Sequence, residues 1–138
     1  MSVSPEAGAL VRQARRIAVV GLSDDPYRPS HSVAAYLQHA GYEIIGVHPA
    51  GGTVLGVKRY PDLRAAAADG PIDIVDIFRR SDAIPSLLDD LLAIHPPLVW
   101  MQLGVEHPAV TAALEAAGIT VVQDRCLAVE HRAILKGS

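Results

Sequence analysis

The fold of this chain is decided by the stretch Gly21-Leu-Ser-Asp-Asp-Pro-Tyr-Arg-Pro-Ser30. It follows a short apolar run, Ile17-Ala-Val-Val20, and precedes a run with helical spacing that begins at Ser32. A buried strand that ends on glycine, turns and enters a helix is the first unit of a doubly wound α/β fold. The start of such a helix presents unpaired N–H groups and the positive end of a dipole, which attract phosphate. The stretch also carries two hydroxyls and a guanidinium, so we expect a ligand that contains phosphate.

Composition limits the class of protein. The 138 residues are 50% hydrophobic and 4% aromatic, with a net charge of -3 and a pI near 6.0. We expect residues 1–138 to form a single domain, because this length and apolar content suit one core. The acidic balance argues against nucleic acid as a bulk partner.

The cytoplasm is the expected location. The single cysteine fits a reducing compartment, and the first sixteen residues lack the apolar core of a signal peptide. No run approaches the roughly 18 apolar residues that span a bilayer, so we expect no membrane partner.

Segments typical of strands and helices alternate along the chain. The expected strands are 17–20, 42–47, 72–78, 98–103 and 119–122, and 53–59 is a short excursion; the expected helices are 5–15, 30–40, 62–68, 81–94, 107–118 and 126–135. We expect Ser30 and Asp62 to cap their helices through their side chains. Short connections between alternating elements imply a parallel sheet of five or six strands with helices on both faces. The predicted fold is a Rossmann-like, three-layer α/β/α arrangement.

Two common nucleotide signatures are missing from the turn after the first strand. A dinucleotide fingerprint needs Gly-x-Gly-x-x-Gly and an acidic residue at the end of the second strand. The chain has only Gly21 of these glycines, and His48-Pro49 stands where the acidic residue is expected. No Gly-Lys-Ser/Thr follows the first strand either. NAD and a P-loop nucleotide are therefore both disfavoured.

Six short motifs then occur in order along the chain. They are Ala18-Val-Val-Gly-Leu-Ser23, Arg28-Pro-Ser30, Gly46-Val-His-Pro49, Asp73-Ile-Val-Asp-Ile-Phe-Arg-Arg80, Trp100-Met-Gln-Leu-Gly104 and Asp124-Arg-Cys126. In these motifs the chain resembles the small stand-alone CoA-binding proteins, whose fold matches the CoA-binding domain of the succinyl-CoA synthetase α subunit. The resemblance covers about residues 16–135. One departure is His48, because the family pattern usually has Asn before this proline.

The resemblance implies that the ligand is coenzyme A (CoA). Its diphosphate would lie over residues 21–30, its adenosine end near His48 and Pro49, and its pantetheine arm along the later strands. The residues expected to bind it are Gly21, Ser23, Arg28, Ser30, His48, Pro49, Phe78, Arg79, Arg80, Gln102 and Gly104. The residues themselves support phosphate binding, because Arg28 and either Arg79 or Arg80 can pair with phosphate oxygens. We expect Arg79 to contact the ligand and Arg80 to form a surface ion pair.

Simpler roles remain open for several of these residues. Gly21 also suits a tight turn, and His48 suits a loop hydrogen bond. Cys126 could form a mixed disulfide with the CoA thiol or act as a nucleophile, although a lone cysteine is more often a small buried hydrophobe. The histidines show no metal-ligand spacing, so we expect no metal site.

We expect a protein that binds CoA or an acyl-CoA for sensing, storage or delivery, without catalytic residues. The Gly-x-Ser-x-Gly elbow of a hydrolase is missing, and the chain has no room for the further domains of the synthetases. Whether it is an enzyme stays open. One alternative is an enzyme that acts on a CoA thioester through His48 or Cys126, and another is a nicotinamide-nucleotide redox sensor. A homodimer is compatible with the sequence, which identifies no other protein partner.

Overall fold

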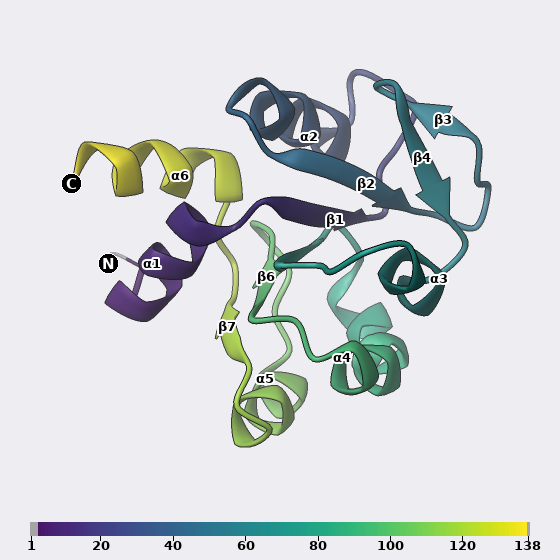
Figure 1. The fold of residues 1–138 in the computed structure, drawn as a ribbon. Helices are drawn as coiled ribbons and strands as arrows, with labels where there is room; N and C mark the ends of the chain where they lie inside the picture. The colour runs from purple at the N-terminus through teal and green to yellow at the C-terminus, as the bar shows by residue number, and fades with distance from the viewer. Residues whose placement is uncertain (1–2, 138) are drawn as a thin grey trace.

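The computed structural model describes residues 3–137, in which one seven-stranded sheet lies between two layers of helices (Figure 1). The strands are β1 (Arg16–Val20), β2 (Glu43–Val47), β3 (Thr53–Val54), β4 (Val57–Tyr60), β5 (Ile74–Ile77), β6 (Leu98–Met101) and β7 (Thr120–Val122). The helices are α1 (Pro5–Gln13), α2 (Pro29–His39), α3 (Leu63–Ala68), the 3₁₀ helix η1 (Ser81–Leu87), α4 (Leu88–Ile94), α5 (Pro108–Ala116) and α6 (Leu127–Lys136). The predicted Rossmann-like α/β fold is confirmed.

The sheet has the order β3-β4-β2-β1-β5-β6-β7, with β3 antiparallel to β4 and the other neighbours parallel. Among the described residues it therefore has seven strands, where the sequence predicted five or six. The segment expected as a short excursion forms a hairpin, and its β4 arm pairs with β2. Leu55 and Gly56 both have positive φ angles in the hairpin turn, which matches the twist of the two strands.

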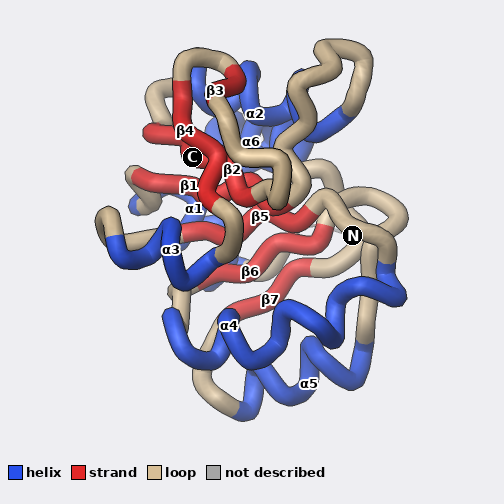
Figure 2. The backbone as a smooth tube through the Cα atoms, turned by 90° about the vertical axis from the view of Figure 1, so that its right-hand side faces the viewer, coloured by secondary structure: helices blue, strands red, loops and turns tan. Residues whose placement is uncertain are grey.

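Helices cover both faces of the sheet (Figure 2). Helices α1, α2 and α6 pack on one face through side chains such as Val11 and Leu37, and α3, α4 and α5 pack on the other through Leu63 and Leu91. All five residues of β1 are buried, since this central strand is covered from both sides. The strands appear in the sequence as apolar runs because helices cover both of their faces.

The strand order reverses between β1 and β5. From β1 the chain adds β2 and then the hairpin on one side, and it returns after α3 to place β5 on the other side of β1. The connections leave β1 and β5 in opposite directions, so a crevice opens at their carboxyl ends. Gly21, directly after β1, has a φ of 87°, and a Cβ there would lie 2.6 Å from the carbonyl oxygen of Phe78. Only glycine permits this approach of the two strand ends.

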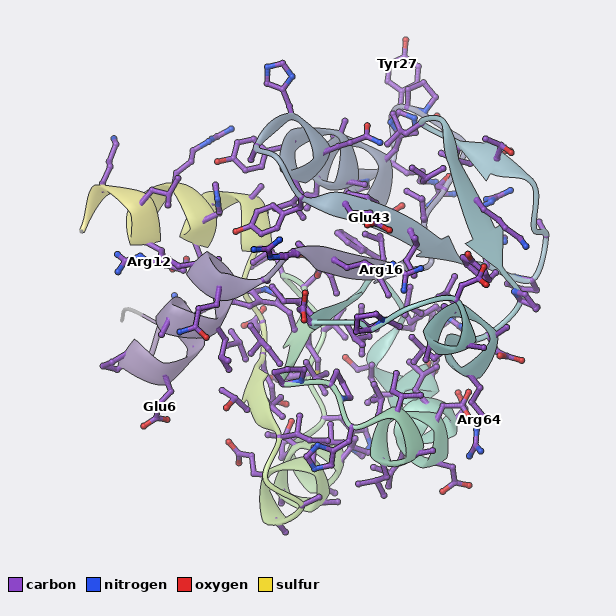
Figure 3. All side chains as sticks on the ribbon, in the orientation of Figure 1. Glu6, Arg12, Arg16, Tyr27, Glu43 and Arg64 are labelled. Carbon is purple, nitrogen blue, oxygen red and sulfur yellow. The ribbon has the colours of Figure 1, made fainter. Side chains whose placement is uncertain are left out.

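Charged side chains hold together the amino ends of the central strands, at the edge of the sheet opposite the crevice. The buried Arg16 guanidinium pairs with Glu43 at 2.9 Å and donates to the carbonyl oxygen of Gly70 at 2.7 Å (Figure 3). Asp73 Oδ2 accepts hydrogen bonds from the backbone N–H groups of Arg15 and Arg16, at 2.8 and 3.0 Å. These charge-assisted bonds fix where β1, β2 and β5 begin.

Two helix starts differ from the sequence prediction. The expected helix 81–94 consists of η1 followed by α4, because the ring of Pro85 would clash with the carbonyl of residue 81 in an α-helix. Helix α2 begins at Pro29 with Arg28 as its N-cap residue, so Ser30 does not cap it. Proline is favoured at the first helical position, where its missing N–H costs nothing. Asp62 caps α3 as predicted, by accepting a hydrogen bond from Ala65 N–H at 2.8 Å.

Within residues 3–137, we find no helix whose length and apolar content would let it cross a membrane.

Asp76 is a carboxyl group in the centre of the sheet. It lies on β5 between Val19 of β1 and Trp100 of β6, and its side chain is fully buried. Neither of its carboxyl oxygens has a hydrogen-bond partner among the described residues. Burial raises the pKa of Asp76 well above its ordinary value of 3.8. The side chain therefore stays protonated in the folded protein over a range of pH in which the unfolded chain is ionised.

Asp76 should make folding less favourable as the pH rises. Above about pH 4 the folded state holds a proton that the unfolded state has lost, so the free energy of unfolding falls with increasing pH. Asp76→Asn keeps the size and shape of the side chain and removes its ionisable carboxyl group. We expect the variant to melt at a higher temperature than the wild type at pH 7 to 8, with the gap closing towards pH 4. Thermal unfolding followed by circular dichroism across this range measures the effect.

Glu115→Gln, at an exposed position of α5, is the matched control and should show no such widening gap. A difference between Asp76→Asn and the wild type that stays constant with pH would contradict the buried-acid explanation.

Candidate functional site

A cleft of ≈ 690 Å³ opens at the carboxyl ends of β1, β5 and β6, where the strand order reverses. Nine of the eleven predicted binding residues line it: Gly21, Ser23, Arg28, Ser30, His48, Phe78, Arg79, Arg80 and Gln102. Pro49 lies in an adjoining hollow of ≈ 380 Å³ on the side of α3 and α4, which shares Gly21, His48, Phe78 and Arg79 with the cleft. The two hollows form one groove across the edge of the sheet.

Gly104 is the predicted residue that the structure places outside both hollows. Its φ of 84° forms the turn after β6, and its N–H donates to Asp124 Oδ1 at 2.7 Å. The backbone geometry of this turn accounts for a glycine at this position.

The loop between β1 and α2 is held by its own hydrogen bonds. Ser30 Oγ accepts from the N–H of Ser23 at 2.9 Å, and Ser23 Oγ accepts from the N–H of Asp25 at 3.0 Å. Asp25 in turn accepts from the N–H of Tyr27 at 3.0 Å. The buried Ser30 hydroxyl thus ties the start of α2 to the loop. These bonds fix the loop before any ligand arrives.

The start of α2 faces the cleft with free donors. The backbone N–H of Ser30 has no acceptor in the described part of the chain, as expected in the first turn of a helix. Arg28, at the N-cap position, is exposed, and its guanidinium has no partner among residues 3–137. A helix start and an unpaired guanidinium at one point form a site for an anion.

Arg79 and Arg80 line the other side of the cleft and differ in their pairing. The Arg80 guanidinium forms an exposed ion pair with Asp82 at 3.1 Å. Arg79 has no ion-pair partner in the described structure, and its Cδ lies 3.6 Å from where a Cβ of Gly21 would stand. The ion pair of Arg80 is the one expected from the sequence, and it leaves Arg79 as the guanidinium of the two without a partner among the described residues.

His48 is oriented by the backbone of its own loop. Its Nδ1 accepts a hydrogen bond from the N–H of Ala50 at 3.0 Å, which leaves the hydrogen of the neutral ring on Nε2. The ring lines both hollows. His48 is therefore able to donate a hydrogen bond to an acceptor within the groove.

The side of the cleft formed by the ends of β5, β6 and β7 carries apolar side chains besides its two arginines. Phe78, Val105 and the half-buried Cys126 line it, together with Gln102, which is only 5% exposed. Gln102 Oε1 accepts from the N–H of Leu127 at 3.0 Å, in the first turn of α6. A helix start that attracts an anion on one side and apolar side chains on the other suit a ligand that has phosphate at one end and an uncharged arm at the other.

Arg59 is a supporting residue whose role was not predicted from the sequence. It is 7% exposed, and its guanidinium donates to the carbonyl oxygens of Gly51 at 2.6 Å and Leu22 at 2.9 Å. It thereby joins the loops that follow β1 and β2. The signal in the sequence is Gly46 on the neighbouring strand, since a Cβ there would lie 2.6 Å from Arg59 Cγ. A glycine inside an apolar strand marks such a close approach.

No group of three or more metal-ligating side chains gathers within residues 3–137.

Tyr27, in the loop between β1 and α2, is 94% exposed and points away from the body of the molecule (Figure 3).

Comparison with known proteins gives consistent matches over most of the chain. The sequence model of a family described as CoA binding domain matches residues 15–132. The uncharacterized protein YneT of Bacillus subtilis (strain 168) is 43% identical over 126 residues, which is 91% of this chain and 92% of that protein.

Solved structures share the fold. A protein of Thermus thermophilus, described as cell-free ID.343, is 42% identical with a TM-score of 0.88, covering 94% of this chain and 96% of its own. A protein of Pyrococcus horikoshii OT3 is 27% identical with a TM-score of 0.88, over 96% of this chain and 93% of its own.

Arg59→Met should destabilise the protein by about 2–3 kcal/mol, because it removes two charge-assisted hydrogen bonds and leaves the carbonyl groups of Leu22, which is buried, and Gly51, which is partly buried, unpaired. Urea unfolding measures the change. Lys58→Met is the control: Lys58 is exposed on the same strand, its Nζ lies 4.8 Å from the ring centre of Tyr60, and its loss should cost less than about 1 kcal/mol. Equal effects of the two substitutions would show that Arg59 does not hold the loops together.

Proposed function

From the premise that this chain belongs to the CoA-binding domain family, we propose that it binds coenzyme A, free or as a thioester, in the cleft. The observation that carries the proposal is that Arg28, at the start of α2, and Arg79 both line the cleft at the reversal point of the sheet, with no partner for either guanidinium within residues 3–137. Open α/β sheets bind their ligands at this point.

The diphosphate would lie over the loop of residues 21–30. The Ser30 N–H and the Arg28 guanidinium would contact its oxygens from one side, and Arg79 from the other. Gly21 contributes the close approach of β1 and β5, Ser23 the shape of the loop, and Arg80 further positive charge at the rim. Each contact would pair an N–H donor with a charged oxygen, which is the strong form of the hydrogen bond.

The two ends of CoA would extend in opposite directions from the diphosphate. The adenosine would occupy the hollow beside His48 and Pro49, where His48 Nε2 donates to a ribose or phosphate oxygen. The pantetheine arm would run past Phe78 and Gln102 on the side of the cleft formed by β5, β6 and β7. Gly104 would act on the ligand indirectly, through the turn that follows β6.

We propose a role in binding, sensing or delivery of CoA. A covalent catalyst needs a nucleophile and a base within hydrogen-bonding reach of each other. His48 Nδ1 is already engaged by the backbone of Ala50, and no hydrogen bond joins His48 to Cys126 among the described residues. These contacts support a cleft arranged to hold its ligand.

Titration calorimetry with CoA, with NAD and ATP as comparison ligands, tests the proposal. We expect CoA to bind selectively. Arg28→Ala should weaken CoA binding by about 1.5–3 kcal/mol, because it removes a charge-assisted contact to phosphate. Turnover of an acyl-CoA that is lost in His48→Ala would instead identify an enzyme.

Arg12→Ala is the matched control, since it removes the same charge from α1, whose Arg12 donates to the carbonyl oxygen of Ile134 and does not line the cleft (Figure 3). Its CoA affinity should equal that of the wild type. Binding of NADH by a protein that ignores CoA would overturn the proposal.

A further inference from the structure

On the side of the cleft formed by β5, β6 and β7, Cys126 is a thiol whose presence the proposed function does not explain. It is half-buried, lines the cleft and is the N-cap residue of α6, where its side chain makes no capping hydrogen bond. It is the one cysteine of the chain, so it cannot form a disulfide within the molecule. A disulfide at Cys126 therefore requires a second thiol from outside.

Gln102 provides an independent sign of a ligand beside this thiol. Gln102 is only 5% exposed, and it lines the cleft. Its Oε1 accepts a hydrogen bond from the N–H of Leu127, the residue after Cys126. No acceptor for its Nε2 is found within residues 3–137. The Nε2 atom is not one of the fully buried atoms that lack a partner, so it is open to the cleft and free to donate to an acceptor on a ligand. The two amide carbonyls of a pantetheine arm are acceptors of this kind.

The cleft thus runs from an anion site to a thiol, in the order in which CoA carries its phosphates, its amides and its sulfur. The loop of residues 21–30 follows β1, Gln102 follows β6 and Cys126 follows β7, and these strands lie in that order across the sheet. Resting on the proposed function, we propose that Cys126 exchanges disulfides with CoA disulfide and holds one CoA as a mixed disulfide.

The exchange balances without any further oxidant. The Cys126 thiolate attacks one sulfur of the CoA disulfide, a new Sγ–S bond forms, and the S–S bond of the reagent breaks. One CoA leaves as a thiolate and takes up a proton equivalent to the one that Cys126 lost. Cys126 is oxidised, and the departing CoA is reduced. Reduced CoA in excess drives the reverse reaction and frees the protein, so the adduct would report the ratio of CoA disulfide to CoA.

The test compares CoA disulfide with pantethine, the disulfide of pantetheine, by intact-protein mass spectrometry over time. The two reagents carry the same reacting sulfur chemistry, and only CoA disulfide carries the phosphates that the anion site would hold. We expect the folded wild type to gain the mass of one CoA moiety at least about tenfold faster than it gains pantetheine, because binding holds the disulfide next to the thiol. In denaturant the two rates should become equal.

Two substitutions assign the reaction to its residues. Cys126→Ser should form no adduct with either reagent. Arg28→Ala should bring the rate with CoA disulfide down towards the rate with pantethine, whereas Arg12→Ala should keep the tenfold preference.

The two proposals can fail separately. Equal rates for the two disulfides in a folded protein that binds CoA by calorimetry would overturn the exchange at Cys126 and leave CoA binding intact. Failure to bind CoA by calorimetry would overturn the proposed function itself. An adduct that still forms in Cys126→Ser would show that the modified group is not this thiol.

Discussion

The contact between the ends of β1 and β5 constrains the rest of the structure. The backbone of Gly21 passes so close to the carbonyl oxygen of Phe78 that a single added carbon atom would lie 2.6 Å from it. With a φ of 87°, Gly21 also turns the chain sharply away from the sheet. The loop that follows can therefore fold back on itself and bring the start of α2 over the crevice. Because Gly21 has no side chain, the ends of β1 and β5 can lie close together and the loop can turn towards the site.

Two groups of arginines differ in the chemical groups that surround the guanidinium. Arg16 and Arg59 are buried and surrounded by backbone carbonyl oxygens, so their charge holds strands and loops in place. Arg28 and Arg79 are exposed at the cleft, and neither has such partners in the part of the chain that the structure describes. A guanidinium that is already saturated has little left for a ligand, whereas a free one beside a helix start favours an anion. The hydrogen bonds that each guanidinium makes within the protein, more than its position in the sequence, distinguish the structural arginines from the candidate ligand contacts.

The fold and the location of the cleft could be predicted from the sequence, because buried parallel strands are short, nearly continuous apolar runs and ligands gather where the strand order reverses. Residues directly after each strand accordingly meet at one edge. The role of Ser30 could not be predicted, since its hydroxyl bonds to Ser23 across a loop whose path depends on Gly21. Arg59 was missed for a similar reason: its partners are carbonyl groups, which every residue possesses. The pairing of β4 with β2 depends on register, which the short run 57–60 does not specify alone.

The two outermost strands of the sheet are its shortest. β3 has two residues and β7 has three, and α1 and α5 both pack near β7. An edge strand with many free N–H and C=O groups is a template on which another chain can add a strand. Here each edge offers room for only a few such bonds. The sheet is therefore a poor nucleus for strand-to-strand aggregation, even though its central strands are mostly apolar segments that would pair readily if they were exposed.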